Sequence, residues 1–336
     1  MPSQTFSPQS TQLPRLTEAR APLTCDITAI NERGESQAVS IPAERALTVY
    51  VDKRELVTLM TLGAHPEWLV LGYLRNQRLV KAASDIESIT VDWEVGAAAV
   101  KTRRGIEDIE EKTARRVVTT GCGQGSVFGG LMDDVDLIHL PVDVTLSQSQ
   151  LYSLVDAIRV KETTYKSSGS VHACALFDAA SPEPEMLLFV EDVGRHNAID
   201  TIAGWMWMNM APTLVASRTA LPPEGAVPPK GGLSAGLAPT LVATPAPVRP
   251  EPLQERTLVF YTTGRLTSEM VIKSAQMGIA VVISRSGITQ MGHAVAQKVG
   301  LCAIGRALNK RFLCFSAPHR LKLETAASAA TAQAGV

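Results

Sequence analysis

The chain has 336 residues, of which 45% are hydrophobic and 19% are charged, and its formal net charge at pH 7 is −1. The length suggests roughly two domains, and the composition is ordinary for a soluble α/β protein with a core of normal size. A chain this close to neutrality has no overall field that attracts nucleic acid or an acidic membrane. Both are therefore excluded as expected partners, and any anionic ligand must be held by a local cluster of cations and backbone amides.

The cysteine content indicates a reducing compartment. The cysteines are odd in number and widely spaced: Cys25, Cys122, Cys174, Cys302 and Cys314. The first twenty residues are rich in Ser, Pro, Gln and Thr and contain no apolar segment of the kind that a secretory signal needs. The longest uncharged run in the middle, residues 201–217, contains Asn209 and Pro212, so no membrane helix is expected. We therefore expect a cytoplasmic protein.

The first half of the chain predicts a smaller, mixed α+β part. Residues 1–20 are expected to form a disordered tail, and residues 21–144 to form the folded part, which ends in a glycine-rich loop around Cys122. Apolar runs, a polar turn and a helix-starting proline predict these elements: hairpin strands at 46–51 and 55–60, a helix from Pro66, and strands at 89–93 and 97–101.

The second half predicts an α/β domain made of residues 145–218 and 256–322. Thr145 and Gln148 form a plausible capping box for the helix that follows. Strands are expected at 171–177 and 186–190, and a polar turn at 191–197 leads into a helix at 198–208. After an insert, strands at 257–263, 279–284 and 301–304 alternate with helices at 268–277 and 288–299. This β-α-β-α-β order predicts parallel strands with right-handed crossovers.

Two further segments are predicted to be disordered. Residues 219–255 contain nine prolines and four glycines, a composition that cannot bury enough apolar surface to offset its ordering entropy. Residues 323–336 are expected to form a second tail.

Cys122 is the candidate catalytic residue. It lies in the run Thr119-Thr120-Gly121-Cys122-Gly123-Gln124-Gly125, where glycines permit positive φ and let a partner approach the thiol closely. Such a thiol is suited to carrying a sulfur atom as a persulfide. Most free cysteines are instead small buried core residues, and that interpretation fits Cys174, Cys302 and Cys314, while Cys25 stays undecided.

Three polar turns follow strands of the predicted α/β domain. They are Glu191–Asn197 with Arg195 and His196, Thr262–Arg265, and Ser284–Ser286 with Arg285. Carboxyl ends of strands in an open α/β sheet bind ligands, and hydroxyls, amides and cations at helix N-termini suit a pyrophosphate. Arg195 could hold a phosphate by a two-pronged contact, and His196 could donate to it or shuttle a proton. A capped helix start with a local ion pair, and solvated loops with surface arginines, are the alternatives.

Zinc catalysis of the deaminase kind is excluded. That chemistry needs His-x-Glu and a later Pro-Cys-x-x-Cys, whereas the nearest match is His172-Ala173-Cys174 and no Cys-x-x-Cys occurs in the chain. No Walker A loop or Gly-x-Gly-x-x-Gly after a strand is present either. We expect no metal of the protein's own.

Five segments of the chain resemble the FdhD family of formate dehydrogenase accessory sulfurtransferases. They are Glu191–Asn197, Gly264-Arg265 with Ser268-Glu269-Met270, Ser284-Arg285-Ser286, Gly169–Ala173 and the segment 50–73. The resemblance covers about residues 40–322 and skips the proline-rich insert. It implies a cytosolic homodimer whose C-terminal part has a cytidine-deaminase-like α/β/α architecture.

The resemblance also implies a function and a site. Cys122 would take sulfur from a cysteine desulfurase and pass it to the molybdenum cofactor, a bis(molybdopterin guanine dinucleotide), before the cofactor enters formate dehydrogenase. The family's cofactor-binding segment falls on Arg306, Ala307, Leu308, Asn309, Lys310 and Arg311.

The family often shows Cys-Gly-x-Cys, whereas Gly125 stands here in place of the second cysteine. A neighbouring cysteine therefore cannot resolve the persulfide as a disulfide. The alternative function is a non-catalytic chaperone that binds and delivers the molybdenum cofactor without sulfur transfer.

Overall fold

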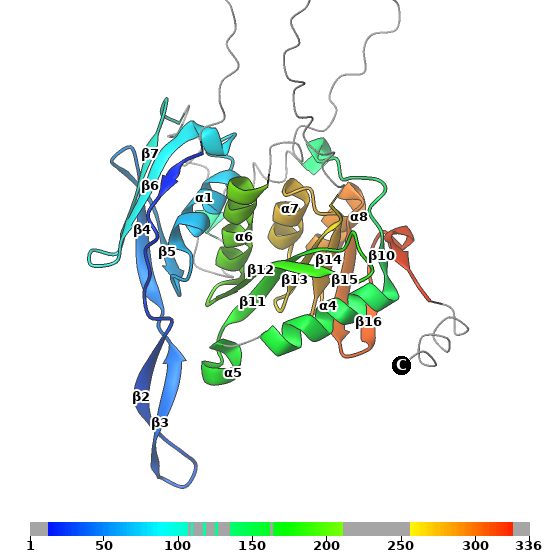
Figure 1. Cartoon of the computed structure of the whole chain (residues 1–336), viewed down its shortest axis with the longest axis horizontal. Coiled ribbons are helices and arrows are strands. Elements are labelled where there is room, and N and C mark those ends of the chain that lie inside the picture. Colours follow the sequence, from blue (N-terminus) through cyan, green and yellow to red (C-terminus); the bar gives the residue numbers. More distant parts are fainter. Residues whose placement is uncertain are drawn as a thin grey trace, which may run out of the picture.

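The computed structural model describes residues 13–106, 109, 117–118, 125–126, 135–161, 164–210 and 256–324. A five-stranded and a six-stranded sheet make up most of this part, and each packs against helices (Figure 1). The fold is mixed α/β, with a smaller N-terminal part and a larger C-terminal part, as the sequence predicts.

The smaller sheet has the strand order β1-β6-β7-β4-β5. Its strands alternate buried and exposed side chains, and the buried row packs against helix α1 (Pro66–Asn76), where Pro66 occupies the first turn. The predicted hairpin, helix and two strands of this region are confirmed. The strand bounds are β1 Arg15–Leu16, β4 Arg45–Val51, β5 Arg54–Thr61, β6 Ile86–Asp92 and β7 Ala97–Thr102.

The larger sheet has the strand order β12-β11-β13-β14-β15-β16. The three strands of the predicted β-α-β-α-β unit pair parallel to one another, which confirms their predicted direction. Their neighbours on both sides run antiparallel. The bounds are β11 His172–Asp178, β12 Glu185–Asp192, β13 Leu258–Thr262, β14 Val281–Ser284, β15 Cys302–Leu308 and β16 Arg311–Cys314.

Helices cover both faces of the larger sheet. One face packs against α6 (Arg195–Asn209), α7 (Ser268–Gln276) and α8 (Gln290–Val299), and the other against α4 (Gln148–Lys161). Side chains of each central strand alternate between these two cores, although nearly all of them are buried, as expected for a sheet covered on both faces.

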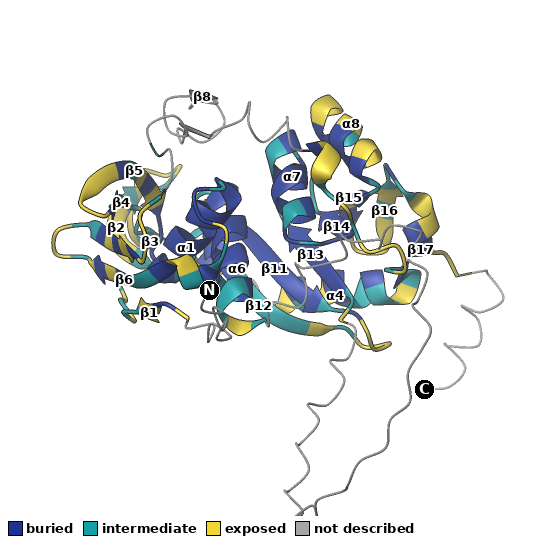
Figure 2. Ribbon diagram, turned by 90° about the horizontal axis from the view of Figure 1, so that it is seen from above, coloured by how far each residue is buried: buried dark blue, intermediate teal, exposed yellow. Residues whose placement is uncertain are grey.

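Helices α1 and α6 join the two halves through glycines. A Cβ atom on Gly72 would overlap the carbonyl oxygen of Asp200, and one on Gly204 would overlap that of Trp68. The two backbones therefore lie closer than any side chain would allow. Figure 2 shows α1, α6 and β11 as buried elements where the two parts meet, whereas α8 exposes one side.

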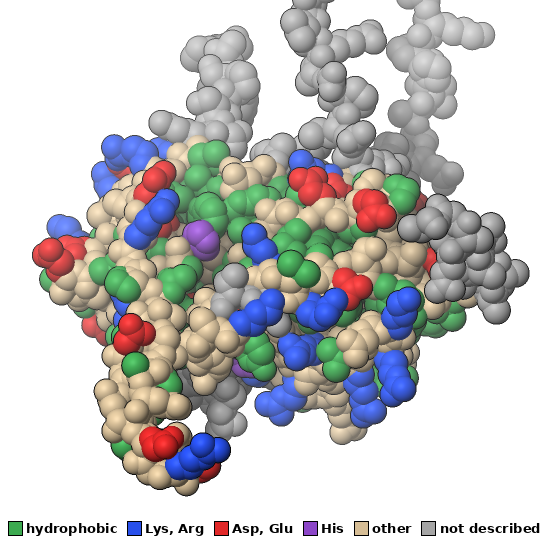
Figure 3. All heavy atoms as spheres, turned by 60° about the horizontal axis from the view of Figure 1, so that its bottom comes forward, with side chains coloured by type: hydrophobic (Ala, Val, Ile, Leu, Met, Phe, Trp, Pro, Cys, Tyr) green, Lys and Arg blue, Asp and Glu red, His purple; other side chains and the backbone are tan. Residues whose placement is uncertain are grey.

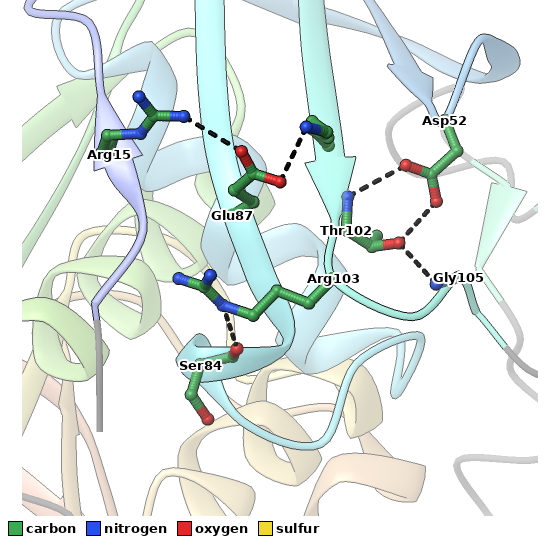
Figure 4. A network of polar contacts seen from close by, with 8 residues as sticks. Arg15, Asp52, Ser84, Glu87, Thr102, Arg103 and Gly105 are labelled. Atoms are coloured by element: carbon green, nitrogen blue, oxygen red, sulfur yellow. Dashed lines mark hydrogen bonds and ion pairs between the residues drawn. The ribbon is translucent and has the colours of Figure 1, made fainter. Parts of the chain in front are cut away.

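Strand β1 corrects the predicted extent of the N-terminal tail, because residues 13–20 are part of the fold. Arg15 pairs with Ser88 of β6, and its guanidinium lies 3.1 Å from Glu87, which also contacts Lys101 (Figure 4). The next turn is fixed by Glu67, which accepts hydrogen bonds from the Thr17 hydroxyl at 2.7 Å and the Ala19 amide at 2.9 Å. These partners lie far along the chain, so local composition gave no sign of them.

Two other boundaries differ from the predicted ones. The capping box of α4 lies at Ser147 and Gln150, whose side chains bond each other's backbone amides, two residues beyond the predicted pair. Val135 and the segment that follows it pack into the core of the larger sheet, so the second part begins before residue 145.

The hairpin of β2 (Thr24–Ile30) and β3 (Ser36–Pro42) was not predicted and projects from the smaller sheet (Figure 1). Another short pair is formed by β10 (Leu146–Ser147) and β17 (Leu321–Lys322), and α5 (Thr164–Ser168) precedes β11. Glu324, which the sequence placed in the C-terminal tail, bonds the amide of Ser149. No helix in the described ranges has the length and apolar character needed to span a membrane.

Replacement of Gly204 by alanine tests the close approach of α1 and α6. Because the added methyl group meets main-chain atoms that cannot rotate away, Gly204→Ala should lower the free energy of unfolding in urea by about 3 kcal/mol or more. Gly287→Ala is the control, since a Cβ there meets nothing within 4 Å, and it should lose no stability. Equal unfolding midpoints for Gly204→Ala and the native chain would contradict this packing.

Candidate functional site

Cys122, the predicted sulfur-carrying residue, lies outside the described residues. The strands on either side of it are β8 (Val117–Val118) and β9 (Gly125–Ser126), which pair antiparallel with Val118 opposite Gly125. The two ends of the segment that contains Cys122 are therefore held side by side.

The carboxyl ends of four strands meet at one edge of the larger sheet. Strand β12 is antiparallel to β11, and β11 is antiparallel to β13, so β12 runs in the same direction as the parallel strands β13, β14 and β15. The predicted polar turns follow these strands and therefore lie at the same edge. The loops after β13 and β14 are bonded together, because Arg285 N–H donates to the Thr262 carbonyl and the Ser284 hydroxyl donates to that of Gly264.

Three residues of the turn 191–197 hold the fold together. Glu191 accepts hydrogen bonds from the amides of Thr164 and Tyr165 at the start of α5. Asp192 accepts from the Thr61 hydroxyl and from the Asn197 amide group, and Asn197 also donates to the Met60 carbonyl. The turn thereby ties the end of β12 to strand β5 of the smaller sheet. The contacts of these three residues are therefore structural, although no side chain caps α6, whose N-cap is Gly194.

Arg195 has a different environment. Its side chain is only 8% exposed and packs against the Gly264 backbone, where a Cβ would come within 2.8 Å of the Arg195 Cδ atom. Its buried Nε has no hydrogen-bond partner among the described residues, although its positive charge helps to lower the pKa of Glu269. A buried donor without an acceptor is costly, so this side chain is suited to an anionic ligand.

Arg195 lies against Gly264, the neighbour of Arg265, and the charges of both arginines act on His172. Burial lowers the pKa of His172, and the positive charges of Arg195 and Arg265 lower it further. Arg265 is exposed at the end of β13, whereas Arg195 is buried beneath the same loop. The structure therefore brings together two of the predicted cations and the imidazole of His172, which belongs to the motif Gly169–Ala173 but was not among the predicted site residues. No group of three or more His, Cys, Asp or Glu side chains in the described ranges is arranged to hold a metal ion.

His196 belongs to a buried charge network. Its Nε2 lies 3.3 Å from Glu269 Oε2. Burial lowers the pKa of His196 to about 3, although Glu269 opposes the shift. At neutral pH the imidazole is therefore uncharged, and its contact with Glu269 makes it part of the network.

Lys273 is the centre of the network. Its Nζ lies 2.9 Å from Asp200 and 3.2 Å from Glu269, and Asp200 also accepts a hydrogen bond from Asn76 of α1 at 2.7 Å. Burial would lower the pKa of Lys273, but the two carboxylates outweigh it and raise the pKa, so the ammonium stays charged. The network ties together α1, α6 and α7 beneath Arg195.

Arg285 belongs to a second cluster at the same edge. It lines a pocket with Leu308 and Asn309 of the predicted cofactor-binding segment and with Arg159 of α4. Its guanidinium carbon also lies 5.8 Å from the centre of the Tyr165 ring. The lining also includes Tyr261 and Asp156, whose carboxylate pairs with Arg159 at 3.5 Å. The pocket is therefore lined by charges of both signs.

The segment 306–311 comprises the end of β15, the turn at Asn309 and Lys310, and the first residue of β16. Arg306 has a φ of 53°, and its amide donates to the Ser286 carbonyl at 2.5 Å, which joins this turn to the loop that carries Arg285. Ala307 is fully buried in the core, so its side chain cannot contact a ligand. Arg306, Lys310 and Arg311 are exposed.

The sheet edge is consequently a basic surface on a nearly neutral protein. Figure 3, in which the bottom of Figure 1 comes forward, shows Lys and Arg side chains gathered over the half that holds the larger sheet, with few acidic ones among them. The exposed cations of this edge are Arg159, Lys166, Arg265, Arg306, Lys310 and Arg311.

Lys273→Met should destabilise the fold strongly. It leaves Asp200 buried without its cation, and removing one member of a buried ion pair costs about 3–5 kcal/mol of unfolding free energy. Lys298→Met is the matched control, since Lys298 pairs with Asp136 at 2.7 Å but both side chains are exposed, and it should cost less than about 1 kcal/mol. Similar urea midpoints for the two variants would contradict the structural role of the network.

Comparison of sequences finds relatives that carry the same name, sulfur carrier protein FdhD. A sulfur carrier protein FdhD of Bacillus subtilis (strain 168) is 26% identical over 295 residues, which cover 87% of this chain and 94% of the relative. The sulfur carrier protein FdhD of Geobacillus kaustophilus is 24% identical over 291 residues, covering 87% of this chain and 93% of that protein.

Comparison of structures supports the fold. The crystal structure of a formate dehydrogenase accessory protein from Desulfotalea psychrophila superposes with a TM-score of 0.61 at 20% sequence identity, covering 89% of this chain and all of that one. The sequence pattern of the FdhD/NarQ family matches residues 42–219 and 251–322. The chain belongs to the FdhD/NarQ family.

Proposed function

We propose that this protein is a sulfur carrier that takes sulfur onto Cys122 as a persulfide from a cysteine desulfurase. It then passes that sulfur to the molybdenum cofactor, a bis(molybdopterin guanine dinucleotide), before the cofactor enters formate dehydrogenase. The names of the relatives support the sulfur-carrying part of the proposal. The basic sheet edge supports the cofactor-binding part.

The observation that carries the cofactor-binding part is the buried guanidinium of Arg195. Its Nε has no acceptor within the described part of the chain, and Arg265 and His172 stand beside it. A guanine dinucleotide carries a pyrophosphate, whose oxygens would accept charge-assisted hydrogen bonds from these groups. The pocket of Arg285, Leu308 and Asn309 lies along the same edge and would hold a further part of the ligand.

The loading step is thiolate chemistry at Cys122. The Cys122 thiolate attacks the terminal sulfur of the desulfurase persulfide, so that a new sulfur–sulfur bond forms at Cys122 and the desulfurase thiolate leaves. No net oxidation occurs, because the sulfur atom moves between two cysteines. Glycines on both sides of Cys122 leave room for the second protein to approach.

Delivery of the sulfur as sulfide requires two electrons. A thiol that attacks the inner sulfur of the persulfide supplies them, because it forms a disulfide with Cys122 and releases hydrosulfide. Gly125 stands where many family members have the second cysteine, so we assign this step to a thiol from outside the motif.

We also propose that the protein is a cytosolic homodimer and that its C-terminal part has a cytidine-deaminase-like α/β/α architecture.

Arg195→Ala should weaken the binding of GDP, the nucleotide part of the proposed ligand. Loss of a hydrogen bond from a charged group costs about 1.5–3 kcal/mol, which corresponds to roughly a tenfold to hundredfold rise in Kd. Isothermal titration calorimetry measures the Kd for GDP. Arg33→Ala, at the exposed tip of the β2–β3 hairpin, is the control and should leave Kd unchanged. Equal affinities for the native chain and Arg195→Ala would remove this residue from the site.

Cys122→Ser should abolish sulfur loading and leave GDP affinity unchanged. The readout is the mass of the chain after incubation with a cysteine desulfurase and cysteine, since a persulfide adds the mass of one sulfur atom. If the native chain gains no sulfur on Cys122 yet binds GDP, the protein is a chaperone that delivers the cofactor without sulfur transfer. If it gains sulfur but does not bind GDP, the proposed role of the sheet edge is wrong.

A further inference from the structure

Two thiols on the neighbouring strands β15 and β16 lie apart from the groups assigned so far. The Sγ atoms of Cys302 and Cys314 are 3.8 Å apart. Ile304 pairs with Cys314, so Cys302, two residues earlier on β15, is the diagonal neighbour of Cys314 on the same face of the sheet. That face is the one covered by α4, where Cys302 belongs to the core and Cys314 packs against its margin.

The two thiols have different environments. Cys302 is fully buried, whereas Cys314 is half-buried on the edge strand of the sheet. The hydrogen bond from Cys302 lowers the pKa of Cys314, because it stabilises the thiolate, and the same contact raises the pKa of Cys302. Cys314 is therefore the reachable nucleophile and Cys302 is the thiol behind it.

The sequence suggested that both were inert core residues, like Cys174. For Cys174 the structure agrees, since burial raises its pKa to about 12. For Cys314 the expectation of full burial is wrong, because strand β16 is an edge strand that the sequence did not predict.

We propose that Cys302 and Cys314 form a redox-active dithiol, which a low-molecular-weight disulfide such as oxidised glutathione converts into an intramolecular disulfide across β15 and β16. In the first step the Cys314 thiolate attacks one glutathione sulfur, a mixed disulfide forms, and one glutathione thiolate leaves. In the second step Cys302 loses its proton, attacks the Cys314 sulfur and displaces the second glutathione. Two protein thiols are oxidised while one glutathione disulfide is reduced to two thiols.

The sulfur atoms must close from 3.8 Å to a disulfide length of about 2.05 Å. Because the two residues are diagonal and not directly opposite neighbours, the bond also requires a local shift of the edge strand β16 against β15. The resulting ring contains the whole segment 306–311. Oxidation would therefore fix the base of the turn that carries Leu308 and Asn309 of the pocket.

The test uses the full chain with Cys25→Ser and Cys122→Ser, because the exposed Cys25 would itself take up glutathione, and three cysteines remain. The reduced protein is incubated with oxidised glutathione, quenched in acid, alkylated under denaturing conditions and weighed. We expect one alkylated cysteine, Cys174, no glutathione adduct, and a crosslinked peptide pair that contains Cys302 and Cys314. Three alkylated cysteines, or a crosslink that involves Cys174 instead, would overturn the proposal.

Two further variants in the same background separate the steps. In Cys302→Ser, glutathione should stay on Cys314, because no thiol displaces it. In Cys314→Ser, neither a crosslink nor an adduct should form, because Cys302 is buried. Since Cys314 is only half-buried, Cys314→Ser keeps the test valid if Cys302→Ser does not fold. A glutathione adduct that persists on Cys314 while Cys302 is present would show that the two sulfurs do not meet in solution.

Discussion

The close contact between α1 and α6 is the constraint on which the rest of the structure depends. Gly72 and Gly204 let the two backbones meet, and the same pair of helices is linked through Asn76 and Asp200. Because α6 also covers one face of the larger sheet, this contact fixes the smaller sheet against the larger one. It also fixes the first turn of α6, which carries Arg195, above the buried Lys273.

The polar side chains of the turn 191–197 have different partners. Glu191 accepts hydrogen bonds from α5, and Asp192 and Asn197 bond to β5. His196 contacts Glu269 of the buried network. Arg195 is the cation of this turn, and its buried Nε has no hydrogen-bond partner in the described structure. The hydrogen bonds of the other residues hold the turn, and contact with Gly264 restricts the Arg195 side chain before an anion binds. Such preorganisation reduces the entropic cost of binding.

Much of the larger part could be predicted from sequence, because β13, α7, β14 and α8 carry regular apolar patterns and end at glycines such as Gly278 and Gly300. The polar turns were predicted at the correct edge for the same reason. Partners distant in sequence were not predictable: β1 depends on β6 and Glu67, and the direction of His196 depends on Glu269 of another helix. The spacing of residues 306–311 likewise did not show that Ala307 points into the core. These features depend on tertiary contacts, which local patterns do not encode.

The central claim is that the cations at the carboxyl edge of the larger sheet bind the pyrophosphate of a guanine nucleotide. A crystal structure of the chain with bound GDP tests it most directly. The account predicts phosphate oxygens within hydrogen-bonding distance of the Arg195 guanidinium, with Arg265 beside them and no displacement of the Lys273 network. GDP bound elsewhere, with Arg195 still lacking an anionic partner, would contradict it.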